Sequence, residues 1–206
     1  MVAGEMEPGV IYSAPALAER FGVSATPVRE AMLDLVGEGM VEPVRNRGFR
    51  VMEVSEADLD QISQIRLLLE VPVMGQVAKL LTPQRAAELS ELGQRIEVAA
   101  ERGDLIQYLD CDRQFHSEMV SIIGNPRLTD LVDRLRRQAR LFGLQQLADT
   151  GRLLASAQEH RAMIRMLQTG DVAASESLMS AHIGHTRGLW AGRSDAGRPG
   201  KDIGRS

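Results

Sequence analysis

Helix start and stop signals divide residues 55–190 into six segments, and they constrain the fold more than any other feature of the sequence. The pattern SEAD at Ser55, the pair TP at 82–83 and Asp104 begin the first three segments. GNP at 124–126 precedes a fourth segment that extends to about Leu147, DTGR and then TGD bound a fifth, and a sixth runs from about 172 to 190. Apolar residues recur at helical spacing throughout, so we predict an all-α six-helix bundle over residues 54–190.

The first 53 residues predict a separate winged helix-turn-helix domain. Two short amphipathic helices are indicated by SAPALAERFG and TPVREAMLDLVGEG, with Gly22 ending the first and Ser24 offering an N-cap to the second. The valine-rich segments MVEPV and FRVMEV follow, and RNRG between them indicates a hairpin with a basic tip. At the other end, residues 191–206 are rich in Gly, Arg and Ser, and we expect a disordered tail there.

The composition agrees with a mainly α protein and narrows its location. Only 3% of the residues are aromatic, although sheets favour aromatic side chains. The single cysteine, Cys111, excludes internal disulfides and multi-cysteine zinc fingers, and it fits a reducing, cytoplasmic compartment. No apolar run is long enough to cross a membrane, so we expect no membrane partner.

Side chains suited to DNA lie at two places in the N-terminal domain. In a helix-turn-helix the N-terminal end of the second helix faces the major groove, where Ser24, Thr26 and Arg29 would contact phosphates or base edges. Arg45, Arg47 and Gly48 occupy the hairpin tip, where arginines neutralise phosphates and glycine permits close approach. Charge favours the opposite interpretation: residues 1–52 hold five arginines and seven acidic residues, so a salt-bridged Arg29 and a solvated hairpin remain alternatives.

Four side chains in the helical region form a candidate metal site. Asp112 and His116 are four residues apart, which on a helix leaves them about 40° apart around the axis and about 6 Å along it. His160 and His182 are in phase with apolar residues of their own helices, so both point inward, whereas His185 falls outside the set and is expected at the surface. A hydrogen-bonded core is one interpretation of these groups. The other is a shared divalent ion (Zn, Ni, Mn or Fe), which would satisfy all four buried polar groups at once.

Residues 17–40 resemble the GntR family of bacterial transcription regulators, with GVSATPVREAM as the closest stretch. The helical region resembles the FCD effector domain of the FadR-like branch through RLLLE (66–70), DRQFH (112–116), GNPRL (124–128), EHRAMIRMLQTGD (159–171) and MSAHI (179–183). The resemblance implies a homodimeric, ligand-responsive regulator, most simply a repressor, that binds double-stranded operator DNA. It also implies that Asp112, His116, His160 and His182 hold a metal. A small carboxylate effector would bind beside the metal on Arg66, whose alternative role is a bridge to Glu70 at i+4.

Two departures from the family pattern keep other functions open. The chain starts at the segment GEMEPG, without the helix that family members place before it, and Ala25 stands where the family has an arginine. A metal-binding helical dimerisation module with impaired DNA binding is therefore one alternative. A metal-dependent hydrolase is another, but the chain lacks the HD and HExxH motifs of such enzymes, so we expect no enzymatic activity.

Overall fold

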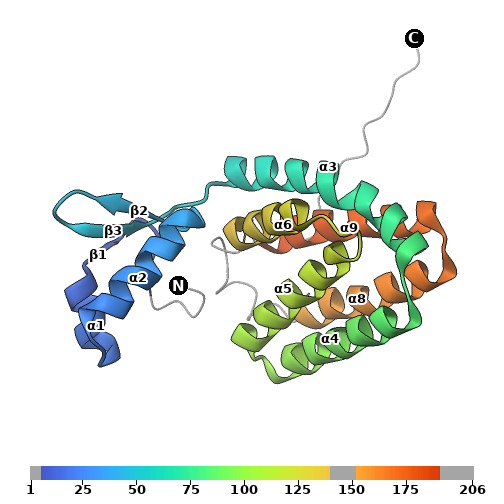
Figure 1. The fold of residues 1–206 in the computed structure, drawn as a ribbon, viewed down its shortest axis with the longest axis horizontal. Coiled ribbons are helices and arrows are strands. Elements are labelled where there is room, and N and C mark those ends of the chain that lie inside the picture. Colours follow the sequence, from blue (N-terminus) through green and yellow to red (C-terminus); the bar gives the residue numbers. More distant parts are fainter. Residues whose placement is uncertain (1–5, 140–151, 191–206) are drawn as a thin grey trace, which may run out of the picture.

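The computed structural model describes residues 6–139 and 152–190, which form two units joined by the short segment 52–55 (Figure 1). The N-terminal unit contains the helices α1 (Ala14–Phe21) and α2 (Ala25–Gly37) and the strands β1 (Ile11–Tyr12), β2 (Val41–Val44) and β3 (Gly48–Val51). The second unit is built from helices alone in the part of the chain that is described. The predicted mainly α fold, with a winged helix-turn-helix followed by an all-α bundle, is confirmed.

The N-terminal unit has the predicted helix pair and hairpin. Gly22 ends α1 in a left-handed conformation with φ of 66°, and Met32 on α2 is buried against the sheet side of the unit. Ser24 occupies the N-cap position of α2, but its side chain makes no capping hydrogen bond. The hairpin carries a third strand that the sequence did not predict: β1 pairs antiparallel with β3 and gives the strand order β1-β3-β2.

Gly48 is required by the neighbouring backbone of its own chain. Its φ is +124°, and a Cβ atom at this position would lie 2.2 Å from the carbonyl oxygen of Tyr12. Because a strand residue sits this close, only glycine fits without moving β1. The folded unit therefore explains Gly48 before any DNA is considered.

Six helices of the described residues form the bundle. They are α3 (Glu56–Leu80), α4 (Pro83–Arg102), α5 (Leu105–Ser121), α6 (Pro126–Ala139), α8 (Arg152–Thr169) and α9 (Val172–Trp190). α3 packs chiefly against α9, and α4 packs against α5 and α8. In Figure 1, α3, α6 and α9 lie in one layer and α4 and α8 in another, with α5 running between them. The end of the predicted fourth helix near Leu147 and the predicted tail at 191–206 lie outside the described residues.

The starts of α3 and α5 follow the predicted capping residues. Ser55 and Asp58 form a reciprocal capping box on α3, and Asp104 Oδ1 accepts a hydrogen bond from the backbone N–H of Gln107 at the start of α5. Asn125 caps the start of α6, because its Oδ1 accepts a hydrogen bond from the backbone N–H of Leu128.

Apolar packing in the bundle centres on α5, whose Phe115 and Met119 are fully buried. Pro72 lies inside α3 and removes one backbone donor from that helix, and Figure 1 shows that α3 is not straight. None of the helices in the described part of the chain combines the length and the apolar character that a membrane span requires.

Candidate metal centre and nucleic-acid interface

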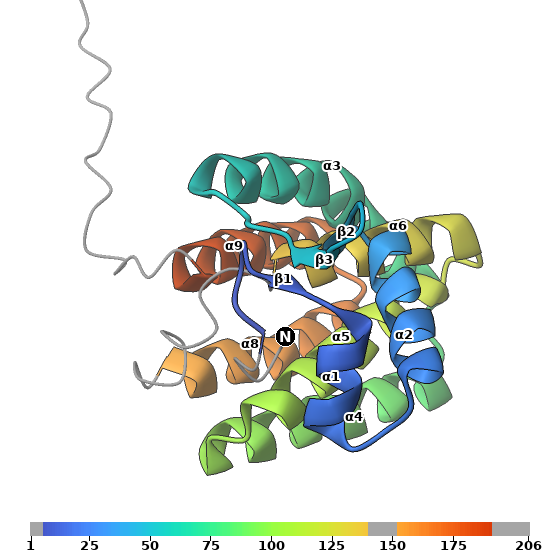
Figure 2. The same cartoon turned by 90° about the vertical axis from the view of Figure 1, so that its left-hand side faces the viewer.

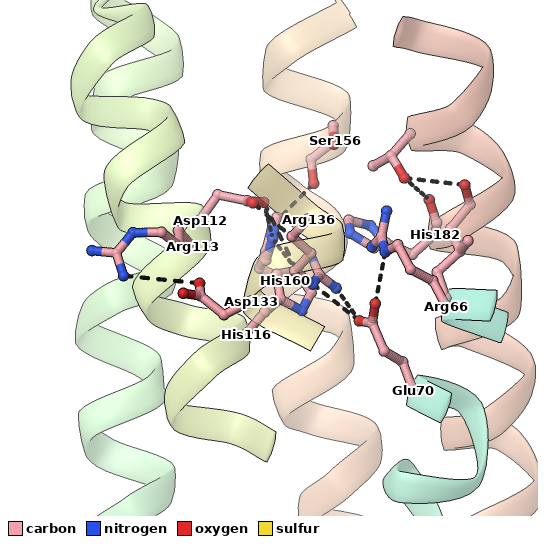
Figure 3. Close-up of polar contacts among 12 residues, drawn as sticks. Arg66, Glu70, Asp112, Arg113, His116, Asp133, Arg136, Ser156, His160 and His182 are labelled. Atoms are coloured by element: carbon pink, nitrogen blue, oxygen red, sulfur yellow. Dashed lines mark hydrogen bonds and ion pairs between the residues drawn. The ribbon is translucent and has the colours of Figure 1, made fainter. Parts of the chain in front are cut away.

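The four predicted metal ligands converge in the interior of the bundle. α5 contributes Asp112 and His116, α8 contributes His160 and α9 contributes His182, and all four are buried (Figure 3). One ligand atom from each lies within 4.8 Å of every other. The three imidazole rings form an even triangle, because each pair of ring centroids is 5.1 Å apart.

Hydrogen bonds made by the Nδ1 atoms of His160 and His182 determine which ring nitrogen faces the cluster. His160 Nδ1 lies 3.1 Å from the carbonyl oxygen of Ser156, which only accepts, so Nδ1 carries the proton. His182 Nδ1 likewise lies 2.6 Å from Glu159 Oε2 and donates to that carboxylate. Each ring therefore directs Nε2 toward the cluster, which is the arrangement of a metal-binding histidine whose other nitrogen donates to a carbonyl or a carboxylate.

The inward atoms lie too close to one another to be explained by one set of neutral hydrogen bonds. His160 Nε2 is 3.0 Å from Asp112 Oδ1 and 3.1 Å from His116 Nε2. His182 Nε2 is buried and has no hydrogen-bond partner among the described residues. Ligand atoms about 2.0–2.2 Å from a divalent ion lie about 3 Å apart, so these spacings fit an ion at the centre of the four groups. Imidazole and carboxylate donors suit Zn, Ni, Mn or Fe.

Burial keeps two histidines of this cluster, His116 and His182, uncharged. Burial, followed by the positive charge of Arg136, lowers the pKa of His116 well below its usual value. Burial also lowers the pKa of His182 to about 4, against the opposing effect of the hydrogen bond that His182 donates to Glu159. Because a metal binds the neutral ring, both shifts leave these side chains ready to coordinate near neutral pH.

A buried network of charges borders the cluster on the side of α3 and α6. Arg66 Nε donates to Glu70 Oε1 at 2.7 Å, and Arg136 Nε donates to Glu70 Oε2 at 3.0 Å. Burial acts to raise the pKa of Glu70, but Arg136 and Arg66 outweigh it and lower the pKa, so this carboxylate is ionised. Burial and the charge of Arg66 lower the pKa of Arg136 to about 10, which still leaves it charged at neutral pH.

Arg66 thus makes the bridge to Glu70 that was the alternative to ligand binding. Its Nη2 atom, however, is buried and has no hydrogen-bond partner among the described residues. The two roles are compatible, because Nε serves Glu70 and Nη2 retains donors for an anion. Sequence reasoning did not identify Arg136 or Glu159, although Glu159 directly precedes His160 in the chain.

His185 is half exposed, as expected for a residue outside the cluster, but it contacts Glu159. Its Nδ1 lies 2.6 Å from Glu159 Oε1. Glu159 therefore bridges His182 inside the bundle and His185 at the surface. Cys111 is buried, and nothing in its position adds it to the cluster.

The side chains predicted to contact DNA lie on the N-terminal unit and are exposed, apart from the half-buried Gly48. Ser24, Thr26 and Arg29 lie at the start of α2 and in its first turns, and Arg45 and Arg47 lie in the turn between β2 and β3. No ion pair holds these three arginines within the described residues, whereas the neighbouring Arg50 pairs with Glu42 at 2.7 Å. Their contact with DNA stays a prediction.

Comparison with known proteins finds two families in order along the chain. Residues 1–51 match the family described as bacterial regulatory proteins, gntR family, and residues 61–185 match the FCD domain. The HTH-type transcriptional regulator McbR of Escherichia coli K12 is 31% identical over 170 residues, which cover 82% of this chain and 77% of McbR. The HTH-type transcriptional repressor RspR of the same strain is 27% identical over 179 residues, covering 85% of this chain and 77% of RspR.

Solved structures agree with these sequence matches. The structure of E. coli McbR/YncC superposes with a TM-score of 0.80 at 27% identity and covers 92% of this chain and 91% of that chain. A GntR regulator from Rhodococcus sp. RHA1 superposes with a TM-score of 0.72 at 21% identity, covering 96% and 93% of the two chains. The second likeness concerns the fold alone.

Proposed function

We propose, for a chain that belongs to the GntR family of bacterial regulatory proteins and carries an FCD domain, that a divalent metal and a small carboxylate control its binding to operator DNA. Membership in the family makes the chain a DNA-binding transcription regulator and not an enzyme. We propose in addition that the protein binds a metal and an effector, that it forms a homodimer and that it represses transcription. We also propose that it is located in the cytoplasm, where bacterial DNA is found.

One observation carries the metal part of the proposal. His182 Nε2 is buried, points into the Asp112, His116 and His160 cluster, and lacks a partner among the described residues. A buried polar atom without a partner costs about 1–3 kcal/mol, and a shared cation would remove that cost for several groups at once. The four side chains named here would hold the ion, which supplies a fixed positive charge that attracts an anionic ligand.

The arginines supply the remaining recognition of a carboxylate. Arg66 Nη2 lies on the side of the cluster that faces α3, and Arg136 spans from Glu70 toward Asp112. A guanidinium binds a carboxylate through paired N–H donors, so the free donors of Arg66 would orient the effector beside the metal. Repression is the simplest outcome, in which the effector changes the relative placement of two winged helices in a homodimer.

Metal content and melting temperature test this proposal together. The chain is purified without histidine tag or chelator, and its metal is measured by mass spectrometry beside a His160→Ala, His182→Ala double variant. We expect about one metal per chain that the double variant lacks, and small carboxylates that raise the melting temperature only in the metal-loaded form. Arg66→Gln should retain the metal and lose the carboxylate response. A wild-type chain that stays metal-free after incubation with Zn²⁺, Ni²⁺, Mn²⁺ and Fe²⁺ would rule the proposal out.

A metal-binding dimerisation module with impaired DNA binding is the second candidate, and Ala25 is the observation that favours it. Ala25 is the first residue of α2, where a longer basic side chain would be able to reach DNA. Retardation of duplex DNA in a gel separates the two candidates. Binding that Arg29→Ala weakens supports the regulator, and metal binding without any retardation supports the module.

A further inference from the structure

The C-terminal end of α6 contacts both units of the protein through consecutive residues. Arg136 faces the candidate metal centre, where its Nη1 lies 3.9 Å from Asp112 Oδ2 and its Nε contacts Glu70. The next two residues face the N-terminal unit. Arg137 Nε lies 3.2 Å from Glu38 Oε2, and Gln138 Nε2 donates to the carbonyl oxygen of Glu38 at 3.3 Å. Figures 1 and 2 both show α2 beside α6.

Glu38 is the C-cap of α2, the helix whose N-terminal end carries Thr26 and Arg29. The last carbonyl groups of a helix bear a partial negative charge, which a cation or a donor nearby stabilises. The last turn of α2 contains no basic residue of its own. Arg137 and Gln138 therefore supply, from about a hundred residues away in the sequence, the charge and the donor that α2 lacks.

Gly39 makes room for this contact. Its φ is +72°, and a Cβ atom there would lie 2.7 Å from Gln138 Nε2. A larger residue would strain the backbone and push Gln138 away from the end of α2. Glycine in the turn after α2 thus leaves room for the Gln138 side chain.

A second connection leads from α5 to the same place. Asp133 pairs with Arg137 one turn later on α6, and its Oδ1 lies 3.9 Å from Arg113 Nη1. Arg113 directly follows Asp112, one of the four candidate ligands. Both faces of α6 are therefore anchored to residues at or beside the metal centre.

We propose that Arg137 and Gln138 position α2 from the bundle, and that α6 carries changes at the metal centre to the DNA-contacting helix. The second part rests on the proposed function. A divalent ion beside Asp112 repels the Arg136 guanidinium and competes for the carboxylate that attracts it. Because α6 is one packed helix, a shift at Arg136 moves its two neighbours and loosens their hold on Glu38.

Amide hydrogen exchange of the full metal-free chain tests the positioning. In Arg137→Gln and Gln138→Ala, we expect residues 34–39 to exchange about two- to fivefold faster than in the wild type, the range that a helix-end charge accounts for. Arg134→Gln is the matched control, because Arg134 is exposed on the same helix, and it should leave this exchange unchanged. Wild-type exchange in both test variants would overturn the positioning role.

Addition of Zn²⁺ then tests the coupling. In the wild type, exchange should slow around Asp112 and His116 and quicken in residues 34–39. The Arg137→Gln, Gln138→Ala double variant should keep the first response and lose the second. A wild type that responds only around Asp112 and His116 would overturn the coupling. A wild type that responds in neither segment would overturn the metal centre and the coupling together, while the metal-free measurement still decides the positioning.

Discussion

Glu159 is the residue that best separates a metal centre from an ordinary polar core. Burial is the largest single influence and acts to raise its pKa, but the hydrogen bonds and charges of His182 and His185 together outweigh burial and lower the pKa, so the side chain is a carboxylate. A carboxylate behind a histidine fixes the tautomer and makes the opposite nitrogen a better ligand. Its position next to His160 in the sequence gave no indication of this, because it contacts a histidine on another helix.

Replacement of Glu159 should therefore weaken metal binding. We expect Glu159→Ala to lower the affinity for Zn²⁺ by about 10–100-fold, and Glu159→Gln to lower it less because an amide oxygen still accepts from Nδ1. Competition with a chromophoric chelator measures both. His185→Ala removes the exposed partner of Glu159 and serves as the control with near wild-type affinity. Equal Zn²⁺ affinities in the wild type and the three variants would contradict the role of Glu159 in orienting His182.

The lowered pKa of His182 predicts how the metal-free protein responds to acid. Its pKa of about 4 lies below the ordinary 6.5, so the unfolded chain binds more protons between these values and folding stability falls as pH decreases through that window. The loss amounts to on the order of 3 kcal/mol at pH 4, since each pKa unit corresponds to about 1.4 kcal/mol. His116 shifts in the same direction.

Urea unfolding in the presence of a chelator, repeated between pH 7 and pH 4, measures this loss. His182→Asn removes the titrating group and should flatten part of the curve. A metal-free wild type whose stability stays constant over this range would contradict the lowered pKa of His182, because the folded and unfolded chains would then bind the same number of protons.

Residue-level prediction worked where one helix carried the information. Helical phase placed Asp112 beside His116 and turned His160 and His182 inward, and the structure brings the four together. Arg136 was missed because the sequence shows the phase of α6 but not which face of it meets α3 and α5. Helix crossing depends on packing between several elements, which a single helical period does not encode.

At the scale of elements, Glu70 holds α3 against α6 by pairing with Arg66 and Arg136. Glu70→Gln should destabilise the fold by about 3–5 kcal/mol, because it leaves two buried guanidinium groups without their counter-charge. Urea unfolding at neutral pH measures the change, and Glu118→Gln, at a half-exposed partner of Arg85, should alter stability by less than about 1 kcal/mol. A small effect of Glu70→Gln would mean that other groups neutralise the arginines.

The arginines in the turn between β2 and β3 can be tested for DNA contact without knowledge of the operator sequence. Arg45→Gln and Arg47→Gln should each reduce the slope of log affinity against log salt by about 1, since each phosphate contact releases about one counterion. A mixed-sequence duplex titrated at several salt concentrations gives the slope. Arg50→Gln, at a residue paired with Glu42, is the control with an unchanged slope.

Elements were predictable to the extent that local signals define them. Capping residues marked the starts of α3, α4 and α5, and glycines marked several ends. β1 was not predicted from the sequence, because a two-residue strand is too short to show a periodic pattern and its pairing with β3 is a long-range contact.

At the scale of the whole molecule, the sequence motifs anticipated both families and their order. They did not anticipate the contacts of Arg137 and Gln138 with Glu38, which join residues about a hundred positions apart beside the turn at Gly39. Such contacts depend on the relative placement of two independently patterned units, and no local signal encodes that placement.

The charges buried in the bundle have one more consequence. Among the described residues, the buried charged side chains are Arg66, Glu70, Asp112 and Arg136, which sum to zero while the histidines are neutral. A divalent ion alone would leave two positive charges in a medium that solvates them poorly. In the proposed site, a cation and an anion would therefore enter together more readily than either would alone.

Calorimetry at equal free Zn²⁺ should therefore find tighter metal binding with succinate than without it, and the gain should shrink in Arg66→Gln. Succinate without effect on metal affinity would contradict this coupling. Such a regulator would respond to its organic ligand only in a cell whose free metal concentration is high enough to fill the site.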